Sequence, residues 1–176
     1  MKQKLLSCGK VATAFGVLLF LCLNSFHGIA QDYITNVTYA YYDNSSIVYD
    51  STIKGVLVYE RLFIKRGKYV VFDFSFDHSA EDGNASVAPT RILFQVDRKL
   101  DQFEIRDQRI LEQNGMYGQV CKCADRGYTR ISDGVISGVK MENGRWQIKM
   151  DVNFKGRFTK KAYSFHLDES FQKARR

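Results

Sequence analysis

Alternation of apolar and polar side chains limits the possible folds of this chain more than any other feature. In residues 145–154 every even position is apolar and every odd position is polar. Residues 69–77 and 91–97 repeat much of this pattern. Successive side chains of a β-strand point to opposite faces, so this period predicts strands with one buried face. The apolar positions of the first segment are Trp146, Ile148, Met150, Val152 and Phe154.

Other apolar segments extend the pattern over most of the chain. Only residues 107–113 and 168–174 suit short helices. A hydrophobic content of 45% excludes a disordered chain. The sequence therefore predicts an all-β fold, a single antiparallel domain of about nine strands with little helix. The further strands are expected at residues 33–42, 54–64, 102–106, 117–123, 131–141 and 157–167.

Two turns predict a C-terminal meander. Asn143-Gly144 favours a two-residue type I′ hairpin, because both residue types tolerate the positive φ that this turn requires. Such a turn places Val139 opposite Ile148. A second turn at Lys155-Gly156 leads into the next strand. Residues 131–167 are therefore expected to form a three-stranded meander.

A third turn, Arg66-Gly67, predicts a hairpin between residues 54–64 and 69–77. In this pairing Arg61 lies opposite Phe72. Both faces of the hairpin are rather apolar, which favours a central position in the sheet.

The connections between these blocks favour a β-sandwich. The polar stretch 78–90 is long for a connection, and residues 107–130 are irregular. Both interrupt the simple up-and-down order of a barrel. We therefore expect an antiparallel sandwich, with a closed, calycin-like β-barrel as the alternative.

The first 30 residues have the features of a cleaved secretory signal peptide. Lys2, Lys4 and Lys10 precede an apolar run of about 13 residues, which is shorter than the ~20 that a membrane-spanning helix needs. Gly28-Ile29-Ala30 fits a signal-peptidase site. We expect residues 31–176 to be exported to the periplasm or secreted. An uncleaved N-terminal anchor is the alternative for residues 1–30.

Cys121 and Cys123 are the two cysteines of the expected mature chain. On a strand both thiols point to one face, with Cα atoms near the upper limit for a disulfide. The pair is therefore either a disulfide, two small buried residues, or a redox or soft-metal thiol site. The first two interpretations suit an oxidising compartment.

Three carboxylates gather in the stretch that follows residue 76. Asp77, Glu81 and Asp82 are hard oxygen ligands of the kind that calcium binds on β-sandwich loops. The spacing does not match an EF-hand, because Asp82 stands where that loop needs glycine. A solvated acidic loop is the simpler interpretation, and calcium is the one cofactor that the sequence suggests.

Two cations are expected on apolar strand faces and form a candidate ligand site. Arg61 is placed by the Arg66-Gly67 turn, and the Lys155-Gly156 turn places Lys161 opposite Met150. An unpaired buried charge is costly, so each cation either reaches water at a sheet end or enters a cavity that binds an anion.

The histidine content limits the possible enzymes. Only His78 and His166 lie outside the expected signal peptide, and neither the His-Glu-x-x-His nor the Gly-x-Ser-x-Gly motif occurs. Catalytic residues are therefore not assigned. Nucleic acid is an unsuitable partner for an exported chain without a basic-aromatic motif. The basic clusters are residues 160–161 and the C-terminal residues 173–176. A C-terminal basic tail suits solvation, with weak attraction to an anionic surface as the alternative.

These features favour an exported, non-catalytic β-domain that binds a ligand or partner at the cell envelope. A small secreted hydrolase is the alternative from another class, and a structural interaction module is a third. The partner is expected to be a ligand or an envelope or extracellular protein, and the mature chain is not expected to span a membrane.

Overall fold

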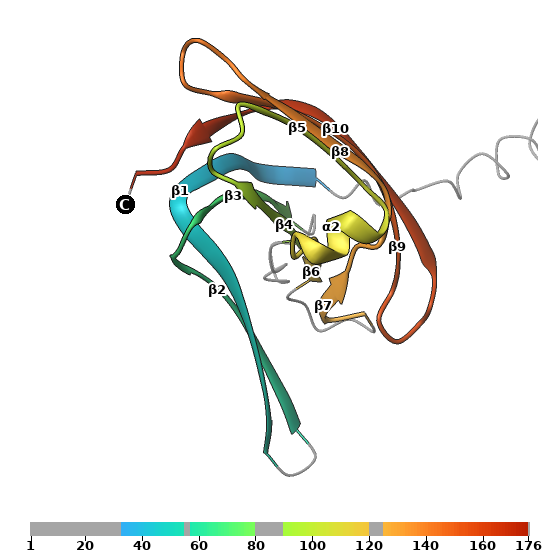
Figure 1. Cartoon of the computed structure of the whole chain (residues 1–176). Helices are drawn as coiled ribbons and strands as arrows, with labels where there is room; N and C mark the ends of the chain where they lie inside the picture. The colour runs from blue at the N-terminus through green and yellow to red at the C-terminus, as the bar shows by residue number, and fades with distance from the viewer. Residues whose placement is uncertain (1–32, 55–56, 80–89, 120–124, 176) are drawn as a thin grey trace, which may run out of the picture. The chain divides into compact units, whose positions relative to one another are not determined.

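Strands of one sheet account for most of the residues in a computed structural model of the chain, which is shown in Figure 1. The structure describes residues 33–54, 57–79, 90–119 and 125–175, and all of them lie in the compact unit Asp32–Arg176. The expected signal peptide, residues 1–30, lies outside the described residues. No helix among the described residues has the length and apolarity needed to cross a bilayer.

The described elements confirm the predicted all-β class. Ten strands form the sheet, in the order β5-β8-β9-β10-β1-β3-β4-β6-β7 with β2 paired to β1, and the sheet is not closed into a barrel. The one described helix is α2 (Gln108–Glu112), inside the predicted helix 107–113. The strands are β1 (Tyr33–Lys54), β2 (Leu57–Arg66), β3 (Tyr69–Ser79), β4 (Thr90–Asp97), β5 (Gln102–Arg106), β6 (Met116–Gln119), β7 (Gly127–Arg130), β8 (Asp133–Lys140), β9 (Trp146–Lys155) and β10 (Ala162–Lys173).

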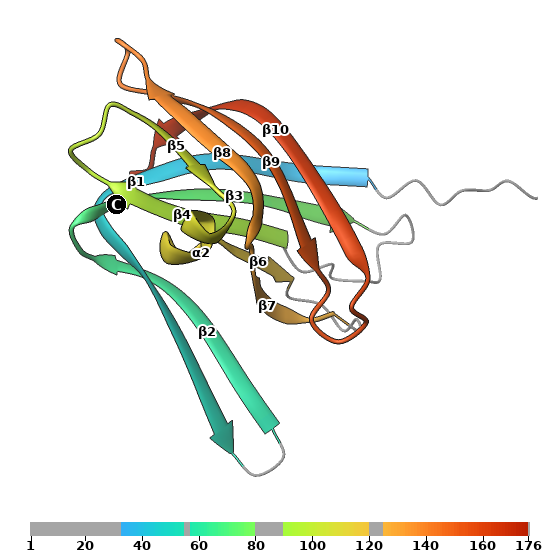
Figure 2. The ribbon, with the colours of Figure 1, turned by 45° about the vertical axis from the view of Figure 1, so that its right-hand side comes forward.

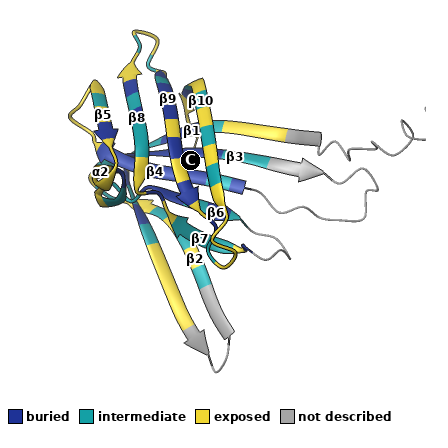
Figure 3. Ribbon diagram, turned by 90° about the vertical axis from the view of Figure 1, so that its right-hand side faces the viewer, coloured by how far each residue is buried: buried dark blue, intermediate teal, exposed yellow. Residues whose placement is uncertain are grey.

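The sheet folds into two facing layers, which gives the sandwich-like arrangement. One layer holds β5, β8, β9 and β10, and the other holds β1, β3, β4, β6 and β7 (Figure 2). The layers are joined where β1 and β10 pair in parallel, with Tyr41 beside Lys173. Along β9 buried and exposed residues alternate as the sequence predicts (Figure 3).

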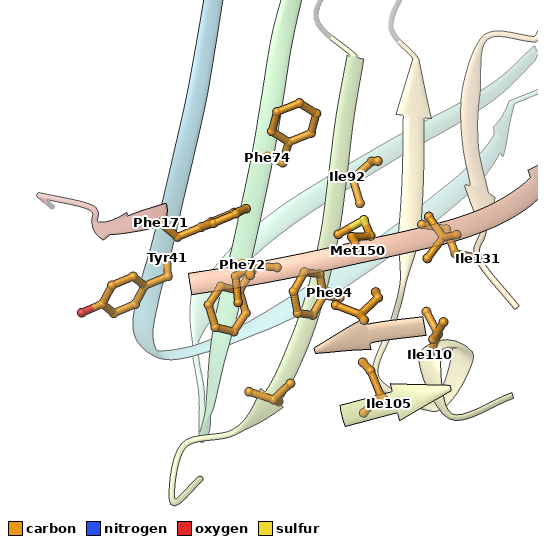
Figure 4. Close-up of a cluster of buried hydrophobic side chains, with 14 of the residues drawn as sticks. Tyr41, Phe72, Phe74, Ile92, Phe94, Ile105, Ile110, Ile131, Met150 and Phe171 are labelled. Carbon is orange, nitrogen blue, oxygen red and sulfur yellow. The ribbon is translucent and has the colours of Figure 1, made fainter. Parts of the chain in front are cut away.

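Aromatic rings from both layers fill the space between them. Phe72 on β3 is fully buried and stacks on Phe94 with ring centroids 4.8 Å apart. The rings of Trp146 and Phe171, from the other layer, lie 5.4 Å and 5.8 Å from the ring of Phe72. Figure 4 shows this cluster, with Phe72 and Phe94 beside Met150 and Phe171. Burial of these rings holds the two layers together.

The first strand is longer than predicted and bends in its middle. Its sequence suggested an end at residue 42, but β1 runs for 22 residues. A register shift lies between Tyr42 and Ser45, and Asn44 has a φ of 49°. Before the bend β1 pairs with β3, and after it β1 pairs with β2. Residues 43–46, which lie between the predicted strands 33–42 and 54–64, form a bulge that redirects one strand.

The hairpin predicted at Arg66-Gly67 is wrong. The chain turns there, but β2 pairs with β1, so that Arg61 lies opposite Asp50 and not Phe72. The neighbours of β3 are β1 and β4. The expected central position holds for β3, whose successive residues Val71 and Phe72 are both fully buried.

The second face of β3 and β4 is partly covered by the start of the β1–β2 pair. Ile47 packs there with Val71 and Leu93 in a second apolar cluster. The same face of these two strands carries Asp73 and Arg91, which form a two-pronged ion pair with N–O distances of 3.1 Å and 2.6 Å. The hydrogen bonds and the charge of Asp73 outweigh the effect of burial and raise the pKa of Arg91.

The C-terminal meander of β8, β9 and β10 is present, but its first turn differs from the predicted type. Met141 N–H donates to the carbonyl of Arg145, which leaves a three-residue connection. Gly144 has a φ of 78°, whereas Asn143 does not adopt a positive φ. Such a loop is a type I turn followed by a glycine bulge. It shifts the register by one residue, so Gly138 lies opposite Ile148 and Val139 is 53% exposed.

The second turn of the meander shifts the register further. Six residues, 156–161, connect β9 to β10, and Val152 lies opposite Phe165. Leu167 therefore occupies the place opposite Met150 that was predicted for Lys161. The helix predicted at residues 168–174 is also wrong, because β10 continues to Lys173 and pairs with both β9 and β1.

Candidate functional site: a basic hollow

The structure places neither Arg61 opposite Phe72 nor Lys161 opposite Met150. Both side chains are exposed, Arg61 on β2 and Lys161 in the connection between β9 and β10. The ammonium of Lys161 lies 5.6 Å from the ring centroid of Tyr163. The registers that motivated a shared anion cavity are wrong, because Arg61 pairs with Asp50 and Leu167 lies opposite Met150.

The remaining predicted site residues lie wholly or partly outside the described residues. This holds for Cys121, Cys123, Glu81 and Asp82. It also holds for the side chain of Asp77, a residue of β3 whose backbone pairs with Asn36 of β1. The thiol and calcium sites therefore stay predictions. Among the described residues no group of three or more His, Cys, Asp and Glu side chains is placed to hold a metal ion.

One histidine–carboxylate pair lies on the outer face of the β9–β10 layer. His166 Nδ1 lies 3.1 Å from Asp151, and the side chains are 71% and 60% exposed. A pair so open to water resembles a surface ion pair more than an enclosed catalytic site. It does not favour the hydrolase alternative.

A hollow of about 690 Å³ lies where four segments of the chain meet. They are the bend of β1, the turn between β2 and β3, the turn between β4 and β5, and the end of β10. We call it the basic hollow, after its charged residues. These are Arg66, Arg98 and Lys173, with Asp43 as the one acid among the lining residues and Asn44 between them.

The bulge in β1 brings these segments together. Because Asn44 adopts a left-handed conformation, its carbonyl turns toward the β2–β3 turn and accepts a hydrogen bond of 2.8 Å from Gly67 N–H. Gly67 packs so tightly on Ser46 that a Cβ atom there would lie 1.8 Å from the Ser46 hydroxyl. This close approach fixes Arg66 beside the bend.

The basic hollow has an excess of positive charge. Lys173 pairs with Asp43 at 2.6 Å, and that hydrogen bond raises the pKa of Lys173, which stays a cation. Arg98 donates to the side-chain oxygen of Asn44 at 2.7 Å, a neutral partner that leaves its charge uncompensated. Arg66 is exposed and has no ion pair with any described residue. Three cations against one acid give a net charge of +2.

A second hollow of about 410 Å³ continues this surface. Its residues include Lys68, Lys99 and Asp97, and it shares Arg98 with the basic hollow. The two hollows together contain five cations and two acids. Guanidinium groups bind the planar oxygens of carboxylate, sulfate and phosphate in a forked geometry, while ammonium groups add charge without fixed orientation. The arrangement can therefore bind a ligand with several anionic groups.

Sequence reasoning found only one part of this surface. The sequence shows the basic cluster at residues 173–176. It does not connect this cluster with Arg66 and Arg98, which lie far from it in the sequence at two separate turns. Only the bend of β1 brings those turns to the end of β10. Comparisons with family models, with curated proteins and with solved structures found no match to this chain.

Proposed function

We propose that this protein is an exported, non-catalytic β-domain that binds an anionic ligand or partner at the cell envelope through the basic hollow. The observation that carries the proposal is the convergence of Arg66, Arg98 and Lys173 from three separate segments on one hollow with a net positive charge. Export is inferred from the charged, apolar and small-residue pattern of residues 1–30.

The surroundings of the basic hollow support binding more than chemistry. Its walls are strand ends and short turns tied by backbone hydrogen bonds, including Ala174 N–H to the Tyr41 carbonyl at 2.9 Å. A rigid wall limits the entropy lost when a ligand is held. The lining residues include neither histidine nor cysteine, and the carboxylate of Asp43 is paired with the ammonium of Lys173.

Removing two of the cations is expected to weaken polyanion binding. The double substitution Arg66→Gln/Arg98→Gln should lower the affinity for heparin, used as a generic polyanion, by roughly tenfold or more, because two charge-assisted hydrogen bonds are lost. Elution from immobilised heparin at increasing salt measures this change.

A matched control separates the basic hollow from net charge. Arg106→Gln/Lys149→Gln removes the same charge from exposed side chains, 62% and 67% exposed, on the other layer. It should elute near the wild-type salt concentration. Equal losses in the two variants would mean that heparin responds to overall charge, and the proposal would fail.

A further inference from the structure

A second basic surface lies at the opposite end of β9 and β10 from the basic hollow. The connection at residues 156–161 begins beside Lys155, whereas the basic hollow includes Lys173 at the other end of β10. At ~3.3 Å per residue the two places are roughly 35 Å apart along the strand. Figures 1 and 2 show this loop and the C-terminal end of the described chain on opposite sides. We call residues 156–161 the β9–β10 loop.

The β9–β10 loop exposes a large apolar side chain among cations. Phe158 is 60% exposed, and the guanidinium of Arg157 lies 5.1 Å from its ring centroid. Lys160 and Lys161 follow it and are both exposed. Residues 155–161 contain four cations and no acid. Among the described residues Arg157 forms an ion pair with Glu60, whereas Lys160 and Lys161 have none. A large exposed apolar side chain with such cations next to it in the chain marks a candidate interaction surface.

The loop is held in a fixed conformation by one carboxylate. Asp125 is buried and accepts hydrogen bonds from the backbone N–H groups of Phe158 and Thr159, each at 2.9 Å. The Thr159 hydroxyl and the Tyr163 hydroxyl donate to its other oxygen. Phe158 is therefore presented by a preorganised backbone, and the loop needs little ordering when it binds.

The hydrogen bonds of Asp125 make a pH-dependent contribution to stability. The hydroxyl and N–H of Thr159, with the N–H of Phe158 and the Tyr163 hydroxyl, outweigh burial and lower the pKa of Asp125 from 3.8 to about 2. A lowered pKa means that the folded protein favours the ionised form, so this stabilisation is present above about pH 4 and is lost as the pH falls toward 2. Thermal unfolding of Asp125→Asn should show lower stability near neutral pH and a shallower decline between pH 4 and 2. An unchanged acid profile would contradict this role.

We propose that the β9–β10 loop docks on an anionic lipid surface, with Phe158 inserted at the headgroup level and Lys160 and Lys161 beside the phosphates, while Arg157 stays paired with Glu60. The charge of the loop complements such a surface, and an exposed aromatic ring among cations suits the boundary between headgroups and acyl chains. One ring and a few cations give weak and reversible membrane binding. This surface is separate from the basic hollow, so the inference goes beyond the proposed function.

The side chains of the loop favour lipid over carbohydrate. Sugar hydroxyls are usually bound by carboxylate and amide side chains beside an aromatic ring, and residues 155–161 contain neither a carboxylate nor an amide side chain. The one hydroxyl, that of Thr159, is already bonded to Asp125. The remaining polar groups are cations, which suit phosphate.

Vesicle sedimentation tests the proposal with the full mature chain. Binding is expected to vesicles of phosphatidylcholine mixed with phosphatidylglycerol, and not to phosphatidylcholine alone. Phe158→Ala should weaken binding roughly tenfold, because the ring no longer leaves water. Lys160→Ala/Lys161→Ala should weaken it roughly twenty-fivefold, at about fivefold for each charge near the surface.

Control variants keep the result interpretable. Val139→Ala removes an exposed apolar side chain elsewhere, and Arg106→Gln/Lys149→Gln removes two exposed cations from β5 and β9; both should bind the mixed vesicles nearly as wild type does. Arg66→Gln/Arg98→Gln is measured beside them and should lose less binding than the loop variants. In Phe158→Trp the added fluorescence should shift to shorter wavelength on mixed vesicles. Each of three results would overturn the proposal. They are binding by Phe158→Ala equal to that of the wild type, no shift in the fluorescence of Phe158→Trp, and a greater loss of vesicle binding in Arg66→Gln/Arg98→Gln than in the loop variants. The last result would place the membrane contact at the basic hollow.

Discussion

Replacing Phe72 with alanine is expected to lower the free energy of unfolding by about 4 kcal/mol. The side chain has no exposed surface and contacts rings from both layers, among them Phe94, Trp146 and Phe171. Its removal leaves a cavity at the place where the two layers meet, and rigid aromatic neighbours cannot collapse to fill it. For a domain whose total stability is ordinarily about 5–15 kcal/mol, this loss leaves little margin.

Urea unfolding of Phe72→Ala and Phe158→Ala measures this effect with a matched control. Both variants lose the same atoms, but Phe158 is 60% exposed and contributes little to the core. The control should lie within about 0.5 kcal/mol of the wild type. Similar losses in the two variants would contradict the assignment of Phe72 to the centre of the sandwich.

Replacing Asp73 with alanine is expected to cost about 3 kcal/mol of folding stability. Its side chain is 7% exposed and its partner Arg91 is 26% exposed, so the substitution leaves a mostly buried cation without its counterion. The loss is therefore larger than for a surface ion pair, for which values below about 1 kcal/mol are usual. Surface pairs such as Lys149–Asp168 provide the comparison.

The double variant Asp73→Ala/Arg91→Met separates the unpaired charge from the lost contacts. Removal of both charges should recover more than half of the loss, because no uncompensated cation remains on the second face of the sheet. Chemical denaturation of the wild type, both single variants and the double variant gives the coupling energy of the pair. A double variant that loses the sum of the two single losses would mean that the charges do not interact.

The fold class follows from local sequence, but the registers do not. Alternation at residues 145–154 is enough to identify β9, since it depends only on which side chains face the core. The pairing of β9 with its neighbours depends on turn geometry, and both turns of the meander differ from the simplest ones. Gly144 alone takes the positive φ in the first turn, and six residues form the second. A slip of one residue at the first turn reverses the faces of β8.

The predictions differ from the structure over the longest stretches in β10 and β1, each of which pairs with more than one strand. Residues 168–174 have no clear period, yet they form a strand because β10 is paired on both sides and buries Phe171 between the layers. The predicted strand ends at residue 42, yet β1 continues through a bulge to pair with β2. Long-range pairing decides both cases, and local propensity does not contain that information.

The candidate site was missed for the same reason. Its cations are spread over the sequence from Arg66 to Lys173, and only the bend at Asn44 brings their turns together. The sequence suggests Arg61 and Lys161 as anion-binding residues, but this suggestion depends on strand registers that the structure corrects. Lys161 nevertheless belongs to a basic surface, that of the β9–β10 loop.

A titration of the isotope-labelled protein with tripolyphosphate, followed by amide NMR shifts, tests the proposed anion site most directly. This compact polyanion carries several charges within reach of a single hollow. We expect saturable shifts at the amides of Asn44, Gly67, Arg98 and Lys173, and none of comparable size at Arg106 and Lys149. Shifts spread evenly over all basic residues, or absent from the basic hollow, would contradict the account.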